Sequence, residues 1–134
     1  MEKNKVMLDT SAYISYLKGY EAIKGVLQEA DEICLNPIVL GELYAGFAHG
    51  NREKKNREIL REFLASPRVH VKDIDEETSE RYAAILAYLW SKGTPIPTND
   101  LWIAATAMQF GLKMLTTDEH YRLVPQIIVH CCAG

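Results

Sequence analysis

Short runs of consecutive apolar residues alternate along the chain with longer segments in which apolar residues recur every three or four positions. The short runs are typical of strands buried in a parallel sheet, and the longer spacing is typical of amphipathic helices. The pattern predicts strands at residues 5–8, 33–35, 69–71, 113–116 and, as a candidate edge strand, 127–129. It predicts helices at about residues 11–18, 21–30, 37–48, 52–65, 75–93 and 99–110.

Residues that favour helix ends support these boundaries. Thr10 or Ser11 can cap the first helix, because a side-chain oxygen at that position accepts a hydrogen bond from a free backbone N–H group. Thr98 or Asn99 can cap the last helix in the same way. Asn36-Pro37 is a favoured start for the third helix, since proline in the first position lacks only an N–H that would have no partner there.

The alternation of strands and helices indicates an α/β fold with a mostly parallel sheet of four to five strands. The chain has 134 residues, of which 48% are hydrophobic, so it is long enough to bury a substantial core. The sequence contains no internal repeat, low-complexity tract or linker. We therefore expect residues 1–134 to form a single domain.

The distribution of charge and of cysteine narrows the class of protein. A net charge of −3 argues against a broad basic surface that coats nucleic acid, although it does not exclude a nuclease whose metal ions supply positive charge locally. Five cationic residues lie within residues 52–61, but the acidic residues among them favour a solvated helix. No segment predicts a membrane span or a secretory signal, and the three cysteines do not suggest a disulfide framework. We expect a cytoplasmic protein with reduced thiols.

Four acidic residues occupy particular positions in this pattern. Asp9 and Asp118 come directly after predicted strands, whereas Glu42 and Asp100 lie in predicted helices that can point back to the same edge of the sheet. Binding sites of parallel sheets form beyond the carboxyl ends of the strands, where the strand order reverses. Each acid alone also has a simpler explanation, since a carboxylate in the first helical turn, such as Asp100, interacts favourably with the helix dipole. Together they predict one acidic site.

Four carboxylates in one place repel each other unless a cation compensates for their charge. Oxygen ligands suit Mg²⁺ or Mn²⁺, which bind phosphate groups and activate water for phosphodiester hydrolysis. Hydroxyl and amide side chains next to the acids can hold the carboxylates in place by hydrogen bonds. These residues are Thr10, Ser11, Asn99 and Thr116.

Four blocks of the sequence, in this order, resemble the signature blocks of PIN-domain ribonucleases, and in particular the VapC toxins of toxin–antitoxin pairs. The blocks are Leu8-Asp9-Thr10-Ser11-Ala12-Tyr13-Ile14, Leu40-Gly41-Glu42-Leu43, Asn99-Asp100-Leu101-Trp102-Ile103-Ala104-Ala105 and Leu115-Thr116-Thr117-Asp118. The resemblance implies a three-layer α/β/α sandwich and an Mg²⁺- or Mn²⁺-dependent endoribonuclease that hydrolyses RNA. It also implies a homodimer and inhibition by a VapB-type antitoxin, whose C-terminal segment covers the active site.

Residue by residue, Asp9, Glu42, Asp100 and Asp118 match the acidic quartet of that family. The resemblance implies that Asp9, Asp100 and Asp118 bind the metal, with Asp118 also able to orient water. Glu42 is expected to act as a ligand through water or as a base. Ser11 departs from the family pattern, because many relatives carry asparagine there; this affects a supporting contact and leaves the quartet intact.

Two further features have competing interpretations. His120 lies close to Asp118 and could contact a substrate phosphate, but an ordinary surface histidine explains it as well. Aromatic residues on the early helices could pack in the core or form a groove that receives the antitoxin. They are Tyr13, Tyr16, Tyr20, Tyr44 and Phe47.

Two other functions compete with the nuclease interpretation. One is a catalytically silent PIN-like module that binds RNA or a protein partner, although a complete acidic quartet argues against it. The other is a phosphatase of the haloacid-dehalogenase type, which requires a second aspartate two residues after the nucleophile. Position 11 is serine, so the sequence lacks that aspartate.

Overall fold

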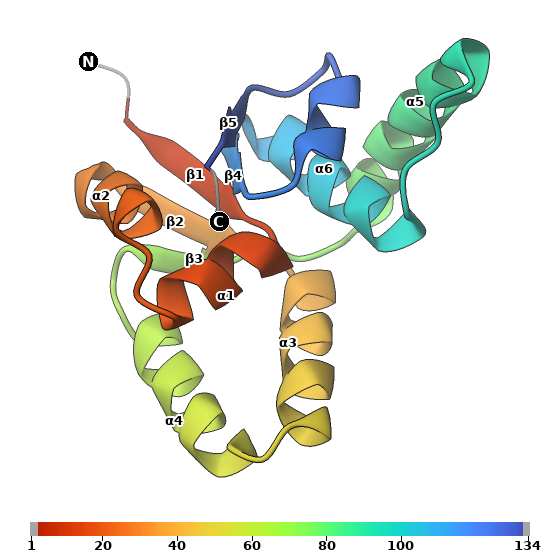
Figure 1. The fold of residues 1–134 in the computed structure, drawn as a ribbon. Coiled ribbons are helices and arrows are strands. Elements are labelled where there is room, and N and C mark those ends of the chain that lie inside the picture. The colour runs from red at the N-terminus through yellow and green to blue at the C-terminus, as the bar shows by residue number, and fades with distance from the viewer. Residues whose placement is uncertain (1–2, 133–134) are drawn as a thin grey trace.

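A parallel sheet with the strand order β3-β2-β1-β4-β5 forms the centre of the molecule (Figure 1). The computed structural model describes residues 3–132, and within them the sheet has five strands. The sheet predicted from the sequence is therefore confirmed, with every neighbouring pair parallel. The strands are β1 (Lys5–Leu8), β2 (Glu32–Leu35), β3 (Val69–Val71), β4 (Lys113–Thr116) and β5 (Val129–Cys131).

Helices cover both faces of this sheet. The chain moves from β1 to β3 in one direction and then returns to β4 on the other side of β1. Because parallel crossovers are right-handed, the connections before and after this reversal pass over opposite faces, which gives the predicted three-layer α/β/α sandwich. Figure 1 shows α5 and α6 apart from α1, α2 and α4. The helices are α1 (Thr10–Leu17), α2 (Glu21–Glu29), α3 (Pro37–His49), α4 (Glu53–Leu64), α5 (Glu76–Lys92) and α6 (Thr98–Phe110), and η1 (Glu119–Leu123) is a short 3₁₀ helix.

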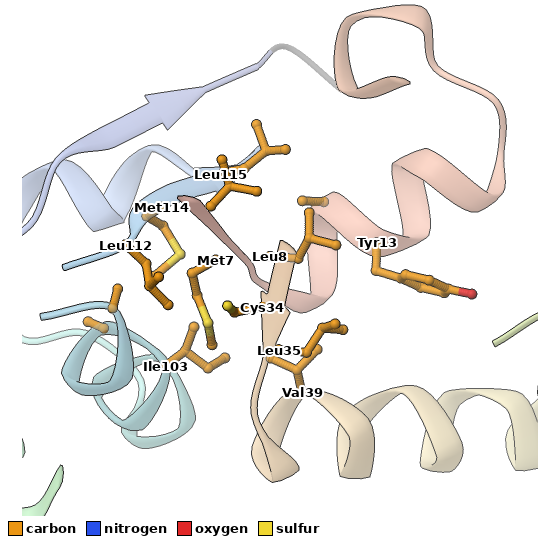
Figure 2. Packing of buried hydrophobic residues seen from close by; sticks show 14 of the residues in the cluster. Met7, Leu8, Tyr13, Cys34, Leu35, Val39, Ile103, Leu112, Met114 and Leu115 are labelled. Carbon is orange, nitrogen blue, oxygen red and sulfur yellow. The ribbon is translucent and has the colours of Figure 1, made fainter. Parts of the chain in front are cut away.

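The core is centred on β1, whose residues Val6, Met7 and Leu8 are completely buried. Met7 pairs with Cys34 of β2 on one side and with Met114 of β4 on the other. Figure 2 shows Met7 next to Ile103 of α6, and Leu35 of β2 next to Val39 of α3, all within the same core. A strand that is covered on both faces needs consecutive apolar residues. β1 and β4 have such runs at Val6–Leu8 and Met114–Leu115, and the sequence therefore predicts both strands. Within residues 3–132, none of the helices has the length and apolar character that a membrane span requires.

Two predicted helix caps are corrected by the structure. Asp9, rather than Thr10 or Ser11, caps α1, because its carboxylate accepts a hydrogen bond from the Ala12 backbone N–H at 2.8 Å. Thr98 is the first residue of α6, and neither it nor Asn99 caps that helix; the flanking residue is Pro97, which makes no side-chain cap. The Asn99 side chain instead contacts Glu42.

The edge strand is displaced by two residues from the predicted position. The sequence indicates residues 127–129, whereas β5 covers Val129–Cys131. Val129 pairs with Met114 of β4, so the neighbouring strand determines the register. Ile128 is 72% exposed, which shows that the apolar run Ile127-Ile128 does not mark burial here.

Asn36 links the start of α3 to α6 and is completely buried. Its Oδ1 accepts a hydrogen bond from the Val39 N–H at 3.0 Å, which confirms the predicted helix start. Its Nδ2 donates to Thr106 Oγ1 at 3.0 Å. Because α3 and α6 each carry one acid of the predicted site, this side chain helps to set their relative position.

We expect Asn36→Ala to lower the free energy of unfolding by about 2–4 kcal/mol, since it removes a helix cap and leaves buried polar groups without partners. Urea unfolding followed by circular dichroism measures this change. The exposed Asn51 gives a matched control, and Asn51→Ala should change stability by less than about 0.5 kcal/mol. Equal effects of the two variants would contradict the assigned role of Asn36.

Candidate metal centre

The four acidic side chains singled out in the sequence come from four different elements at the carboxyl edge of the sheet. Asp9 follows β1, Asp118 follows β4, Glu42 lies in α3 and Asp100 lies in the first turn of α6. β1 and β4 are direct neighbours, with Leu8 paired to Leu115. The strand order reverses between these two strands, and this is where parallel α/β sheets place their binding sites.

Asp9 is the most buried of the acids, with 4% of its surface exposed. Its carboxylate accepts hydrogen bonds from Thr116 Oγ1 at 2.6 Å and from Ser11 Oγ at 2.8 Å, in addition to the bond from the Ala12 N–H. Burial raises the pKa of Asp9, and the nearby charge of Asp100 raises it further, while these hydrogen bonds act in the opposite direction. Asp9 is thus held by neutral donors close to a second carboxylate.

Ser11 and Thr116 also connect Asp9 to the segment that carries Asp118. The Asp118 N–H donates to Thr116 Oγ1 at 2.9 Å, and the Thr117 N–H donates to Ser11 Oγ at 3.1 Å. Each hydroxyl therefore donates to Asp9 and accepts from the chain after β4. These bonds fix the position of Asp118 relative to Asp9.

Glu42 is held by the other two polar residues that the sequence indicates as supports. Thr10 Oγ1 donates to Glu42 Oε1 at 2.5 Å, and Asn99 Nδ2 donates to Glu42 Oε2 at 3.2 Å. Thr10 adjoins Asp9, and Asn99 adjoins Asp100. Hydrogen bonds thus connect Glu42 to the segments that carry two of the other acids, so all four predicted supporting residues contact a carboxylate of the site.

His120 is a residue of the site that the sequence interpretation underestimated. Its Nε2 contacts Asp100 Oδ2, and its Nδ1 lies 2.5 Å from Asp118 Oδ1. One ligand atom each from Asp100, Asp118 and His120 lies within 4.8 Å of the others. The sequence signal was its spacing of two residues from Asp118, but only the turn of η1 directs the imidazole back between the two carboxylates.

Tyr121, the neighbour of His120, is a further residue of this region, and no pattern in the sequence singles it out. Its side chain is 1% exposed, and its hydroxyl has no hydrogen-bond partner among residues 3–132. Burial raises the pKa of Tyr121 strongly, and the charges of Asp9, Asp100 and Glu42 raise it further. The buried phenol therefore keeps its proton at neutral pH, and the charges of Asp9, Asp100 and Glu42 disfavour its ionisation.

The site carries a concentration of negative charge without fixed positive charge. Among the described residues, no lysine or arginine forms an ion pair with any of the four acids; only His120 contacts two of them. The side chains offer carboxylate oxygens and one imidazole nitrogen, a donor set that fits a divalent cation. The hydroxyl of Tyr121, which has no partner among the described residues, is a hydrogen-bond donor available to these carboxylates.

The aromatic residues of the early helices divide into two groups. Tyr13 and Phe47 are buried, so the core-packing alternative holds for these two. Tyr16 lines a surface groove together with Leu27 of α2 and with Ile59 and Phe63 of α4. In the cationic segment, Arg57 lies 3.5 Å from Glu53 and stacks over the Tyr44 ring, in agreement with a solvated helix.

The fold and this geometry define a parallel α/β protein with an acidic site where its strand order reverses. The family model of the PIN domain matches residues 6–126, and the chain belongs to the PIN domain family.

The chain is similar to proteins of several bacteria over nearly its whole length. It is 29% identical to ribonuclease VapC4 of Mycobacterium tuberculosis, covering 96% of this chain and 98% of that protein. It is 31% identical to ribonuclease VapC1 of Haemophilus influenzae, and the alignment covers 82% of this chain and 84% of that protein. Among solved structures, a DNA-bound VapBC from Salmonella typhimurium superimposes with a TM-score of 0.85 at 28% identity, covering 96% of this chain and 98% of that one.

The raised pKa of Asp9 leads to a prediction about stability without divalent cations. The folded protein binds this proton more tightly than the unfolded chain, so the free energy of unfolding falls as pH rises from the ordinary pKa of 3.8 through the raised folded value. Asp9→Asn cannot ionise and lacks this contribution. We therefore expect the stability of the variant relative to the wild type to increase as pH rises from 4 to 7.

Urea unfolding in a chelating buffer at a series of pH values measures this difference. Replacing the carboxylate by an amide also changes the hydrogen bonds at this position. That change alters the free energy of unfolding of the variant by the same amount at every pH, so it does not produce a dependence on pH. A difference that stays flat, or that decreases with rising pH, would contradict the argument.

Proposed function

We propose that this protein is a metal-dependent endoribonuclease and the toxin of a type II toxin–antitoxin pair. The observation that carries the proposal is the cluster of Asp100, Asp118 and His120, whose ligand atoms lie within 4.8 Å of one another. Asp9 and Glu42 are linked to the same segments by hydrogen bonds, and none of the four acids pairs with a lysine or arginine among the described residues. The similarity to proteins named ribonuclease VapC, over most of both chains, supports RNA as the substrate.

Asp9, Asp100 and Asp118 would hold Mg²⁺ or Mn²⁺ in this site. Their oxygens suit both ions, and a cation would offset both the desolvation of the Asp9 carboxylate and its repulsion by Asp100. When bound, the ion supplies Lewis acidity toward the phosphodiester and favours deprotonation of water.

The remaining contributions come from side chains of the protein. Ser11 and Thr116 hold Asp9 and the Asp118 segment in register, so the carboxylates do not need to reorganise. Thr10 and Asn99 fix both oxygens of Glu42, which can then accept a proton from water at the reacting phosphate. Because these hydrogen-bond donors are neutral, they orient the carboxylates without neutralising them, so the negative charge remains available to a cation.

The groove lined by Tyr16, Leu27, Ile59 and Phe63 supports a role for a protein partner. We assign it to a VapB-type antitoxin, whose amphipathic segment could place apolar side chains there. The solved VapBC from Salmonella typhimurium supports this partner. We further propose that the chain acts as a homodimer in the cytoplasm.

We expect Asp100→Asn to reduce RNA cleavage at least about 100-fold, because the amide removes a charged metal ligand and keeps the shape of the side chain. A cleavage assay on labelled RNA measures the loss, and circular dichroism confirms the fold. Chelation should stop wild-type cleavage, and added Mg²⁺ or Mn²⁺ should restore it.

The exposed Asp73 provides the matched control, since Asp73→Asn removes one carboxylate outside the site and should leave cleavage unchanged. Full activity of Asp100→Asn, or cleavage that is insensitive to chelation, would contradict the proposal. RNA binding by a wild-type protein that does not cleave RNA would favour the silent binding module.

The toxin assignment has a separate test in cells. Expression of the wild-type chain should arrest bacterial growth because it degrades RNA, whereas expression of Asp100→Asn should not. Co-expression of a small protein encoded beside the gene should relieve the arrest. Growth curves under inducible expression measure both effects, and equal arrest by the wild type and the variant would argue against toxicity through cleavage.

A further inference from the structure

The hydroxyl of Tyr121 is a buried polar group without a partner in the described part of the chain. Burial without a hydrogen bond is unfavourable for a hydroxyl, and a phenylalanine would fill the same space without that penalty. Packing therefore explains the ring of Tyr121 and leaves the oxygen unexplained.

The surroundings of this oxygen suggest what it does. Tyr121 adjoins His120 in η1, and the two rings stack with centroids 5.0 Å apart. His120 contacts Asp100. Burial raises the pKa of Tyr121 most, and the charge of Asp100 and the approach of its side chain to the hydroxyl raise it further, although the hydroxyl makes no hydrogen bond within residues 3–132. A neutral phenol among carboxylates can act only as a donor to them.

We propose that Tyr121 is a positioning residue of the cation site, whose hydroxyl donates a hydrogen bond to the Asp100 carboxylate when that carboxylate binds a divalent cation. This inference rests on the proposed metal-dependent function. In the structure the Asp100 carboxylate contacts His120. With Asp100 as a metal ligand, the hydroxyl of Tyr121 would hold its carboxylate in place, in the way that hydrogen-bonded partners commonly support metal ligands.

The chain contains a matched control for this proposal. Tyr13 is also completely buried, and its hydroxyl likewise has no partner among residues 3–132. Burial and Tyr16, rather than a carboxylate, raise the pKa of Tyr13 to about 12. Figure 2 shows its ring on α1 directed away from β1 and β4. Removing either hydroxyl thus makes the same chemical change, but only one of them lies in the acidic site.

Calorimetric titration of the full chain with MnCl₂ tests the proposal. We expect Tyr121→Phe to weaken Mn²⁺ binding about 10-fold or more, because it removes support from a ligand. Tyr13→Phe should bind Mn²⁺ as the wild type does. Without the cation, both variants should be as stable as the wild type or more stable, since each loses an unpartnered buried hydroxyl.

The possible outcomes separate this inference from the proposed function. If the wild type does not bind Mn²⁺, the metal-dependent function fails. If the wild type and Tyr121→Phe bind equally, or if both tyrosine variants weaken binding to the same extent, the role of Tyr121 is overturned and the metal site remains. Should Tyr121→Phe prove less stable, the rise of its unfolding midpoint with Mn²⁺ concentration gives the same affinity.

Discussion

The pairing of β1 with β4 is the constraint on which the acidic site depends. These strands are separated by more than 100 residues, yet Leu8 and Leu115 lie side by side in the sheet. Because both strands run in the same direction, the residues that follow them emerge at the same edge. Asp9 and Asp118 therefore approach each other through the topology, and the hydrogen bonds of Ser11 and Thr116 only refine a position that the sheet has set.

The sequence predicts those parts of the fold in which runs of apolar residues coincide with segments that are buried in the structure. β1 and β4 are covered on both faces and show continuous apolar runs. At the edge of the sheet this agreement is lost, because the pairing of Val129 with Met114 sets the register of β5, while Ile128 stays exposed. Likewise, the capping role of Asp9 was hidden because the adjacent Thr10 and Ser11 are equally good caps in a sequence.

The sequence predicts which acidic residues belong to the candidate site, but it does not predict how they are arranged in space. The sequence places Asp9 and Asp118 after strands, but their meeting requires the strand order, which local periodicity does not contain. His120 and Tyr121 were missed or underestimated for a related reason. Both lie in η1, a short 3₁₀ helix without a distinctive pattern, and only the three-dimensional path of that turn directs their side chains toward the carboxylates.

The choice of neutral partners for the acids is itself informative about the site. A lysine or arginine beside these carboxylates would stay charged at neutral pH and would compete with a divalent cation for the same oxygens. Hydroxyls and an amide can orient carboxylates without neutralising them, and Thr10, Ser11, Asn99 and Thr116 do this. His120 is the exception, because its two ring nitrogens contact Asp100 and Asp118. The arrangement therefore keeps the acids fixed in position and leaves their charge to be balanced by an ion.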